Sequence, residues 1–239
     1  MRSPSTNQSI ARDLDSLVPD ELLTEASPAA EQRIADRLQE SLHPVTPLPS
    51  RATLVAAFLA IFATVTALLF AFGGTRGAEN MTVLQLAGIL TAILAAAGLA
   101  AFSLSGEMTP GQRRFVRPGA LVVGIFGGLF ALISGLFPWT VGAVQGWHCF
   151  VNGFVCSIPA LILVLWVVRK GAPLAYGTVG ATAGLLGGLV GMAAIHVGCS
   201  LLSAPHIAVG HLTIPLAGTI MGYLAGRALP YLLTRSNQS

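Results

Sequence analysis

Long apolar runs separated by short polar segments dominate the chain from Ala52 onward. Six runs are predicted to be membrane-spanning helices, at residues 52–72, 82–105, 119–137, 150–168, 174–197 and 209–233. Each run is long enough, as an α-helix, to cross a hydrocarbon core about 30 Å thick, and none contains an acidic residue. The pattern therefore predicts an all-α polytopic membrane bundle of six transmembrane helices.

The first 51 residues have a different character. They hold eight of the ten acidic residues and five of the thirteen basic ones, so their net charge is −3. They lack the apolar stretch of a secretory signal peptide, and we expect none to be present. We expect three regions: a cytoplasmic N-terminal region at residues 1–51, a transmembrane domain at 52–233 and a short cytoplasmic tail at 234–239.

An amphipathic helix is predicted within the N-terminal region. Ser27 and Pro28 are suited to the first positions of a helix, and Ile34, Leu38 and Leu42 then share one face. A helix of about fifteen residues is marginally stable alone in water, so it needs a partner. A membrane-surface helix or a partly disordered tail is one interpretation, but such surface helices are usually basic. We therefore interpret Ile34, Leu38 and Leu42 as a surface that binds a partner protein.

Overall composition agrees with a membrane protein. Hydrophobic residues make up 54% of the chain and charged residues 10%, against roughly 25% charged in soluble proteins. The formal charge of +3 does not indicate direct nucleic-acid binding, because the basic residues lie singly or in short groups at span ends. Twelve of the thirteen fall on one side of the predicted bundle and only Arg76 on the other. The positive-inside rule therefore places both termini in the cytoplasm.

Glycines recur every four residues in three of the predicted spans. Gly124 and Gly128 lie in the third span, Gly180, Gly184 and Gly188 in the fifth, and Gly218, Gly222 and Gly226 in the sixth. Helix faces made of small residues approach closely and gain van der Waals contact. We expect tight packing around the fifth and sixth spans, within one chain rather than between two, although a homo-oligomer is left open.

Histidine and cysteine residues gather at the predicted outer face of the membrane. His148 and Cys149 lie at the start of the fourth span, with Cys156 two helical turns deeper. His196 and Cys199 lie at the end of the fifth span, and His206 and His211 lie close to the start of the sixth. Residues of these two types would divide between both faces of the membrane if they were placed at random, so their clustering on one face indicates a functional site. The candidate sensing residues are His148, Cys149, Cys156, His196 and Cys199.

Two kinds of chemistry fit this group of side chains. Thiolate and imidazole ligands suit zinc and similar soft cations, so His148, Cys149, His196, Cys199 and His206 are candidate ligands of a regulatory metal ion. Alternatively, Cys149 and Cys199 could form a disulfide in an oxidising compartment and lock two spans together. Plain packing of these side chains at the membrane interface is the third interpretation.

Catalysis is not predicted. The spans contain no carboxylate of the kind that marks an ion or proton pathway, and no glycine-rich phosphate loop follows a strand. Serine side chains in the spans have no acid–base partner set nearby in the sequence. The sequence therefore predicts a binding protein without a resident cofactor, in contact with the lipid bilayer.

Several segments together resemble one known family. They are Trp147-His-Cys-Phe, Ser157-Ile-Pro, the run Leu165-Trp-Val-Val-Arg-Lys-Gly-Ala-Pro-Leu174, the small-residue helix that ends with His196 and Cys199, and the run from Asp36 to Pro49. Over about residues 35–233 the chain resembles the negative-regulator-of-sigma-F family of six-span proteins of the bacterial inner membrane. The resemblance implies an anti-sigma factor that holds an extracytoplasmic-function sigma factor and releases it under oxidative or heavy-metal stress.

The family's paired cysteines correspond to Cys149 and Cys199. This chain departs from the family pattern after the fifth span, where it has His196-Val-Gly-Cys199-Ser200 instead of a histidine followed directly by Cys-Pro. It also has about thirty additional N-terminal residues. A small membrane transporter or metal-handling protein that uses the same histidine and cysteine cluster is the alternative, and the lack of carboxylates within the spans disfavours it.

Overall fold

The structure, a computed structural model, describes residues 32–37, 49–109, 117–140, 146–171 and 175–236. The chain divides into two units, Met1–Pro47 and Leu48–Ser239. In the first unit, residues 32–37 are helical with exposed side chains, and Ile34 is 58% exposed. Leu38 and Leu42 lie outside the described residues. The predicted apolar face is therefore described only at Ile34, whose side chain is exposed.

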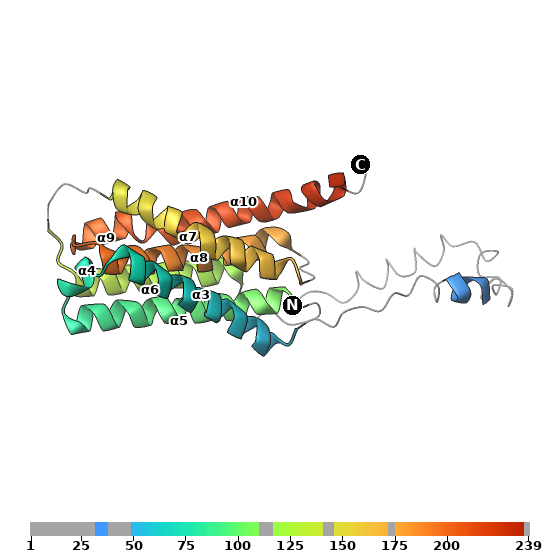
Figure 1. Ribbon diagram of the computed structural model, residues 1–239, viewed down its shortest axis with the longest axis horizontal. Coiled ribbons are helices and arrows are strands. Elements are labelled where there is room, and N and C mark those ends of the chain that lie inside the picture. Colours follow the sequence, from blue (N-terminus) through green and yellow to red (C-terminus); the bar gives the residue numbers. More distant parts are fainter. Residues whose placement is uncertain (1–31, 38–48, 110–116, 141–145, 172–174, 237–239) are drawn as a thin grey trace, which may run out of the picture. The chain divides into compact units, whose positions relative to one another are not determined.

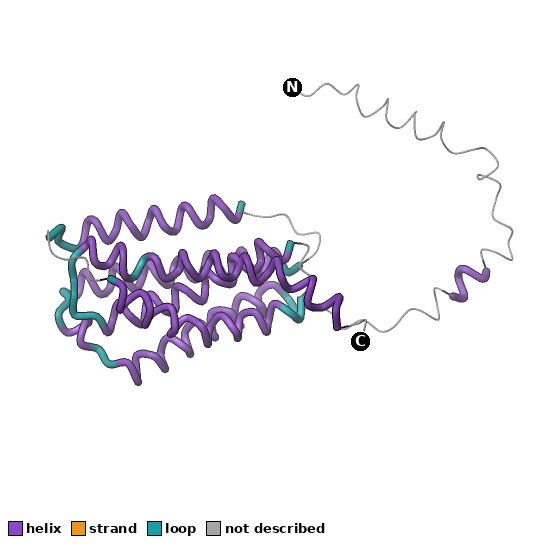
Figure 2. Tube along the Cα trace, turned by 90° about the horizontal axis from the view of Figure 1, so that it is seen from above, coloured by secondary structure: helices purple, strands orange, loops and turns teal. Residues whose placement is uncertain are grey.

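The second unit is a bundle of helices (Figure 1). Its six long helices are α3 (Arg51–Gly73), α5 (Val83–Glu107), α6 (Pro118–Leu136), α7 (Trp147–Val168), α8 (Tyr176–Gly198) and α10 (Thr213–Ser236). Two short helices, α4 (Arg76–Glu79) and α9 (Ala204–Gly210), lie between them. The described residues contain no strand (Figure 2), and the bundle contains six spans that are long and apolar enough to cross a membrane. The predicted all-α, multi-pass membrane fold is confirmed.

Two helix boundaries differ from the prediction in ways that matter for the site. Helix α7 begins at Trp147 rather than at residue 150, because the Phe150 amide already donates to the Gly146 carbonyl oxygen at 2.9 Å. The sixth predicted span, 209–233, is instead divided into α9 and α10, with a turn at residues 211–212. The first turn of α7 thus contains Cys149, and α9 forms a separate element.

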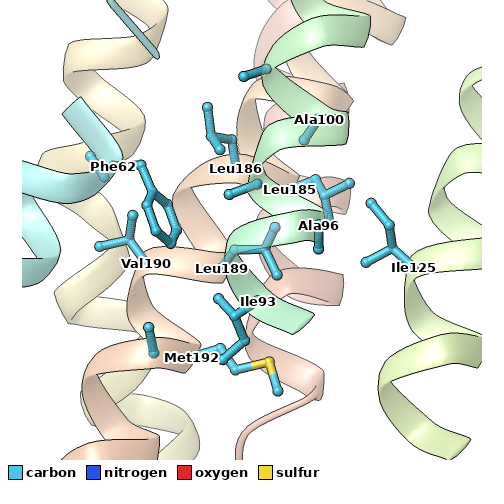
Figure 3. Close-up of a cluster of buried hydrophobic side chains, with 14 of the residues drawn as sticks. Phe62, Ile93, Ala96, Ala100, Ile125, Leu185, Leu186, Leu189, Val190 and Met192 are labelled. Carbon is cyan, nitrogen blue, oxygen red and sulfur yellow. The ribbon is translucent and has the colours of Figure 1, made fainter. Parts of the chain in front are cut away.

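Helix α8 is the centre of the bundle. In its most apolar stretch 78% of the residues are buried, against 22–44% in the other five spans. Leu186, Leu189 and Val190 of this helix pack between Phe62 of α3 and Ile93 of α5 (Figure 3). Because α8 is surrounded on nearly all sides by protein, its position fixes those of its neighbours.

Glycine lets α8 and α10 approach at backbone distance. A Cβ atom added at Gly180 or Gly184 would overlap the carbonyl oxygen of Gly222 or Gly218 on α10, respectively. Such contact requires residues without a side chain. The predicted tight packing of these two spans within one chain is confirmed. Gly124 and Gly128 of α6, in contrast, have no atom within 4 Å of an added Cβ, so the third span makes no such contact.

The two rims of the bundle differ chemically. One rim, called here the thiol rim, contains α4, the start of α7, the end of α8 and α9 (Figure 1). The opposite rim contains Arg51, whose guanidinium donates to the Phe102 carbonyl oxygen at 3.1 Å and lies 3.6 Å from the Phe102 ring centroid. Lys170 lies over the Trp166 ring at the same rim, at 3.8 Å. Basic and aromatic pairs of this kind are typical of membrane–water interfaces.

We predict that Gly184→Ala destabilises the bundle. The added methyl group overlaps the Gly218 carbonyl oxygen, so the helices must separate, at a cost of about 1–3 kcal/mol. The matched control is Gly127→Ala in α6, which meets no atom within 4 Å and gains about 0.5–1 kcal/mol of helix propensity. Thermal unfolding in detergent compares the two variants. Equal or higher stability of Gly184→Ala would contradict the packing described for α8 and α10.

Candidate functional site

Four side chains from three helix ends meet at the thiol rim. Cys149 lies in the first turn of α7, and Cys199 is the C-cap of α8, with its amide donating to the Ile195 carbonyl oxygen at 2.8 Å. His206 lies within α9, and His211 is the C-cap of that helix. Residues separated by as many as 62 positions thus come together because the ends of α7, α8 and α9 share one rim.

The sulfur and nitrogen atoms of these side chains are close enough to act together. The two Sγ atoms of Cys149 and Cys199 are 3.4 Å apart, and Sγ of Cys199 is 3.4 Å from Nε2 of His206. One ligand atom from each of Cys149, Cys199, His206 and His211 lies within 4.8 Å of the others. We call these four residues the thiol–imidazole cluster.

A third histidine supports the cluster from inside the bundle. Nδ1 of His196 lies 3.2 Å from Nδ1 of His211, and both side chains are fully buried. The His196 ring also makes an edge-to-face contact with Phe137, with ring centroids 5.5 Å apart. His206 is 3% exposed. The histidines therefore form the buried side of the site.

Glycine residues bring the backbones together around the cluster. A Cβ atom at Gly77 of α4 would overlap the Cys199 carbonyl oxygen, so α4 lies directly against the end of α8. A Cβ atom at Gly146 would lie 3.0 Å from Cα of Gly210, which brings the start of α7 against the end of α9. The positions of Cys149, Cys199 and His211 are therefore set by backbone contacts as well as by their own side chains.

The cysteine side of the site is open. A cavity of about 570 Å³ is lined by both cluster cysteines together with Arg76, His148 and Cys156. His206 and His211 do not line this cavity. A small solute can therefore reach the sulfur atoms from the cavity, while the imidazoles contact them from the protein interior.

The candidate residues named from the sequence separate into three groups in the structure. Cys149, Cys199 and His206 belong to the cluster, and His196 lies behind it against His211. His148 and Cys156 line the cavity outside the cluster. Neighbouring residues on a helix point about 100° apart, so His148 and Cys149 face different directions, and His148 is exposed.

His211 joins the cluster although it was not among the candidate ligands. The sequence placed it near the start of the sixth span, five residues after His206. A straight helix would turn the two rings about 140° apart, because each residue adds about 100°. The end of α9 at Gly210 removes this constraint, and the two ring centroids lie 5.3 Å apart. Because the sequence predicted an unbroken span over this region, the position of His211 in the cluster could not be predicted from it.

The geometry permits two reactions of the cysteine pair. A tetrahedral zinc site with Zn–S near 2.3 Å and Zn–N near 2.0 Å has two sulfur ligands about 3.8 Å apart and a sulfur and a nitrogen ligand about 3.5 Å apart. The two observed distances of 3.4 Å would therefore have to lengthen by only about 0.1–0.4 Å. A disulfide requires sulfur atoms about 2.05 Å apart, so the free thiols would have to move by roughly 1.4 Å. The cluster is thus arranged for a soft cation or for oxidation.

Six membrane spans with a thiol and imidazole cluster at one rim define a multi-pass membrane protein with a candidate site at the helix ends. The chain matches the family described as negative regulator of sigma F over residues 38–230. Since the match covers most of the chain, the protein belongs to this family of regulators that act on a sigma factor. No curated protein and no solved structure matches the chain.

We predict that a mild thiol oxidant such as diamide links Cys149 to Cys199 within one chain. The sulfur atoms are adjacent and accessible from the cavity, whereas Cys156 lies seven residues, or about 10.5 Å of helix, from Cys149. Mass spectrometry of alkylated peptides identifies the bond. Cys156→Ser serves as the control and should form the same bond. A cross-link that always includes Cys156 would contradict the geometry.

Proposed function

We propose that the protein is a membrane-bound anti-sigma factor of the bacterial inner membrane. It sequesters an extracytoplasmic-function sigma factor and releases that factor on oxidative or heavy-metal stress sensed at Cys149 and Cys199. The observation that supports this proposal most strongly is the 3.4 Å separation of two accessible thiols in a member of a family of sigma-factor regulators. The role is one of binding rather than catalysis.

The N-terminal region is proposed to bind the sigma factor. Its apolar residues Ile34, Leu38 and Leu42 would cover an apolar surface of the partner. Its net charge of −3 would attract the basic groups with which a sigma factor contacts DNA. The exposure of Ile34 supports this role. By the positive-inside rule, the basic residues at the rim opposite the cluster support a cytoplasmic location for this region, where transcription occurs.

Sensing is proposed to occur by a change in the bonding of the two sulfur atoms. Oxidation by a peroxide joins the two thiols in a disulfide and reduces the peroxide O–O bond, with both thiol protons transferred to the products (water in the case of hydrogen peroxide). A thiophilic cation would instead displace the two thiol protons and bind both thiolates. Either change alters the distance between the start of α7 and the end of α8.

Helix α8 is suited to transmit this change. It begins with Tyr176 at the rim opposite the thiol rim, ends at Gly198 next to Cys199, and packs against α3, α5, α7 and α10. Helix α3 in turn begins at Arg51, the last residue of the N-terminal region, and the Arg51 side chain donates to Phe102 and Ser105 of α5. A displacement of α8 relative to α3 is therefore the simplest route from the cluster to the N-terminal region. This route requires a bundle with two stable arrangements.

We predict that Cys149→Ser and Cys199→Ser each abolish the stress response of the controlled genes. Either variant leaves one sulfur atom in the thiol–imidazole cluster, which is too few for the Cys149–Cys199 disulfide or for a two-thiolate cation site there. The measurement is a transcriptional reporter in cells exposed to peroxide or to Cd²⁺, and Cys156→Ser is the matched control with a normal response. An unchanged response in both cluster variants would remove the sensing role.

We predict that the full-length protein in detergent captures a sigma factor from the host cell. Ile34→Asp combined with Leu38→Asp should reduce capture at least tenfold, because two charges are placed on the apolar face. Gln32→Asp, on the opposite face of the same helical turn, is the control for added charge. Retained capture by the double variant would show that this face is not the binding surface. If the wild-type protein captures no sigma factor, the result favours the alternative of a small membrane transporter or metal-handling protein.

A further inference from the structure

We propose that Cys149, Cys199, His206 and His211 form a tetrahedral site for one divalent d¹⁰ cation, such as Zn²⁺ or Cd²⁺. His196 is a positioning residue that orients His211. The cation site is a property of the bundle itself, and only its regulatory consequence rests on the proposed function. It specifies His206 and His211 as ligands, four-fold coordination and a divalent ion, none of which the proposed function specifies.

The distances support tetrahedral coordination. The Sγ–Sγ distance and the distance from Sγ of Cys199 to Nε2 of His206 are both 3.4 Å, close to the separations of about 3.8 Å (S–S) and about 3.5 Å (S–N) expected between ligands of one tetrahedral zinc ion. All four ligand atoms fall within 4.8 Å of one another, so small side-chain rotations complete the tetrahedron. A set of two thiolates and two imidazoles binds soft and borderline cations in preference to Mg²⁺ or Ca²⁺, which prefer oxygen ligands.

Charge selects a divalent ion. Two thiolates carry a charge of −2, the imidazoles are neutral as ligands, and a divalent cation therefore gives a neutral site. A monovalent cation would leave one negative charge against the buried histidines, where an unpaired charge is costly. Arg76 lines the same cavity, but it is exposed, so water screens its charge. Neutrality thus favours Zn²⁺ and Cd²⁺ over Cu⁺.

His196 fixes the ring of His211. Their Nδ1 atoms are 3.2 Å apart, so one of them must donate and the other accept. When Nδ1 of His211 donates, its Nε2 keeps a lone pair for the cation, and this buried atom has no hydrogen-bond partner within the described part of the chain. A hydrogen bond to the second nitrogen of a ligating histidine is the usual way to set its orientation. His196, held by Phe137, supplies that bond.

The same two sulfur atoms serve the cation and the disulfide. A cation bound by both thiolates removes the nucleophile that a disulfide requires, and a disulfide removes both anionic ligands. The two states therefore exclude each other. The cavity gives the cation access from the cysteine side, while the buried histidines complete its coordination from the interior.

The test is titration of the reduced, purified full-length protein with Cd²⁺, followed through the thiolate-to-metal charge-transfer absorption. We expect one Cd²⁺ per chain, and with Co²⁺ the visible absorption of a tetrahedral complex. His206→Ala and His211→Ala should each weaken binding more than tenfold, and His196→Ala about tenfold with the stoichiometry unchanged. His148→Ala, on the exposed rim of the cavity, is the matched control and should bind normally. Equal weakening by His148→Ala, or no effect of His206→Ala and His211→Ala, would overturn the assignment.

A second measurement needs no substitution, so it is independent of folding defects in the variants. Wild-type protein oxidised with diamide should bind no Cd²⁺ and should regain one site after reduction, and Cd²⁺-loaded protein should form the disulfide at least tenfold more slowly. Cd²⁺ binding to the oxidised protein with unchanged affinity would overturn the shared site. Loss of the cation site with intact sigma-factor capture would refute this inference alone, whereas a cation site without capture would refute only the proposed function.

Discussion

The close approach of α8 to its neighbours is the constraint on which the structure depends. Without a water-driven hydrophobic force between helices in lipid, packing depends on how near the backbones come. Glycine faces on α8 and α10 bring carbonyl oxygens to positions that a Cβ atom would occupy, and Gly191 of α8 meets Gly153 of α7 in the same way. Since α8 is held on several sides, its last residue, Gly198, and the adjacent Cys199 have a fixed place.

The fixed position of the α8 end explains why the thiol and imidazole side chains form one cluster instead of lying apart along the rim. Cys199 is set by the end of α8, Cys149 by the start of α7 packed on α8, and His211 by the end of α9 packed against Gly146. The buried side is imidazole and the open side is sulfur. Under the proposed function, a change of bonding at the sulfur atoms would act at the end of α8, the helix that packs against most of the others in the bundle.

Much of the fold could be predicted from the pattern of apolar runs, because length and hydropathy alone define a membrane span. The glycine faces of α8 and α10 could be predicted from their four-residue period, yet the same period at Gly124 and Gly128 produced no contact, since spacing does not show which way a face points. The grouping of Cys149 with Cys199 could be expected, because the predicted topology placed both residues at the same face of the membrane. The place of His211 in the cluster could not, because it depends on the end of α9. Helix geometry separates His148 from Cys149, but which of the two faces the cluster depends on how α7 is rotated in the bundle.

The most direct test of the central claim measures the state of the two thiols and the location of the sigma factor in the same cells. Cells are exposed to graded peroxide, thiols are trapped by alkylation, and the fraction of chains with a Cys149–Cys199 bond is compared with the fraction of sigma factor that co-purifies with the protein. The account predicts that release rises in proportion to the bonded fraction. Complete release while both cysteines stay reduced would contradict it.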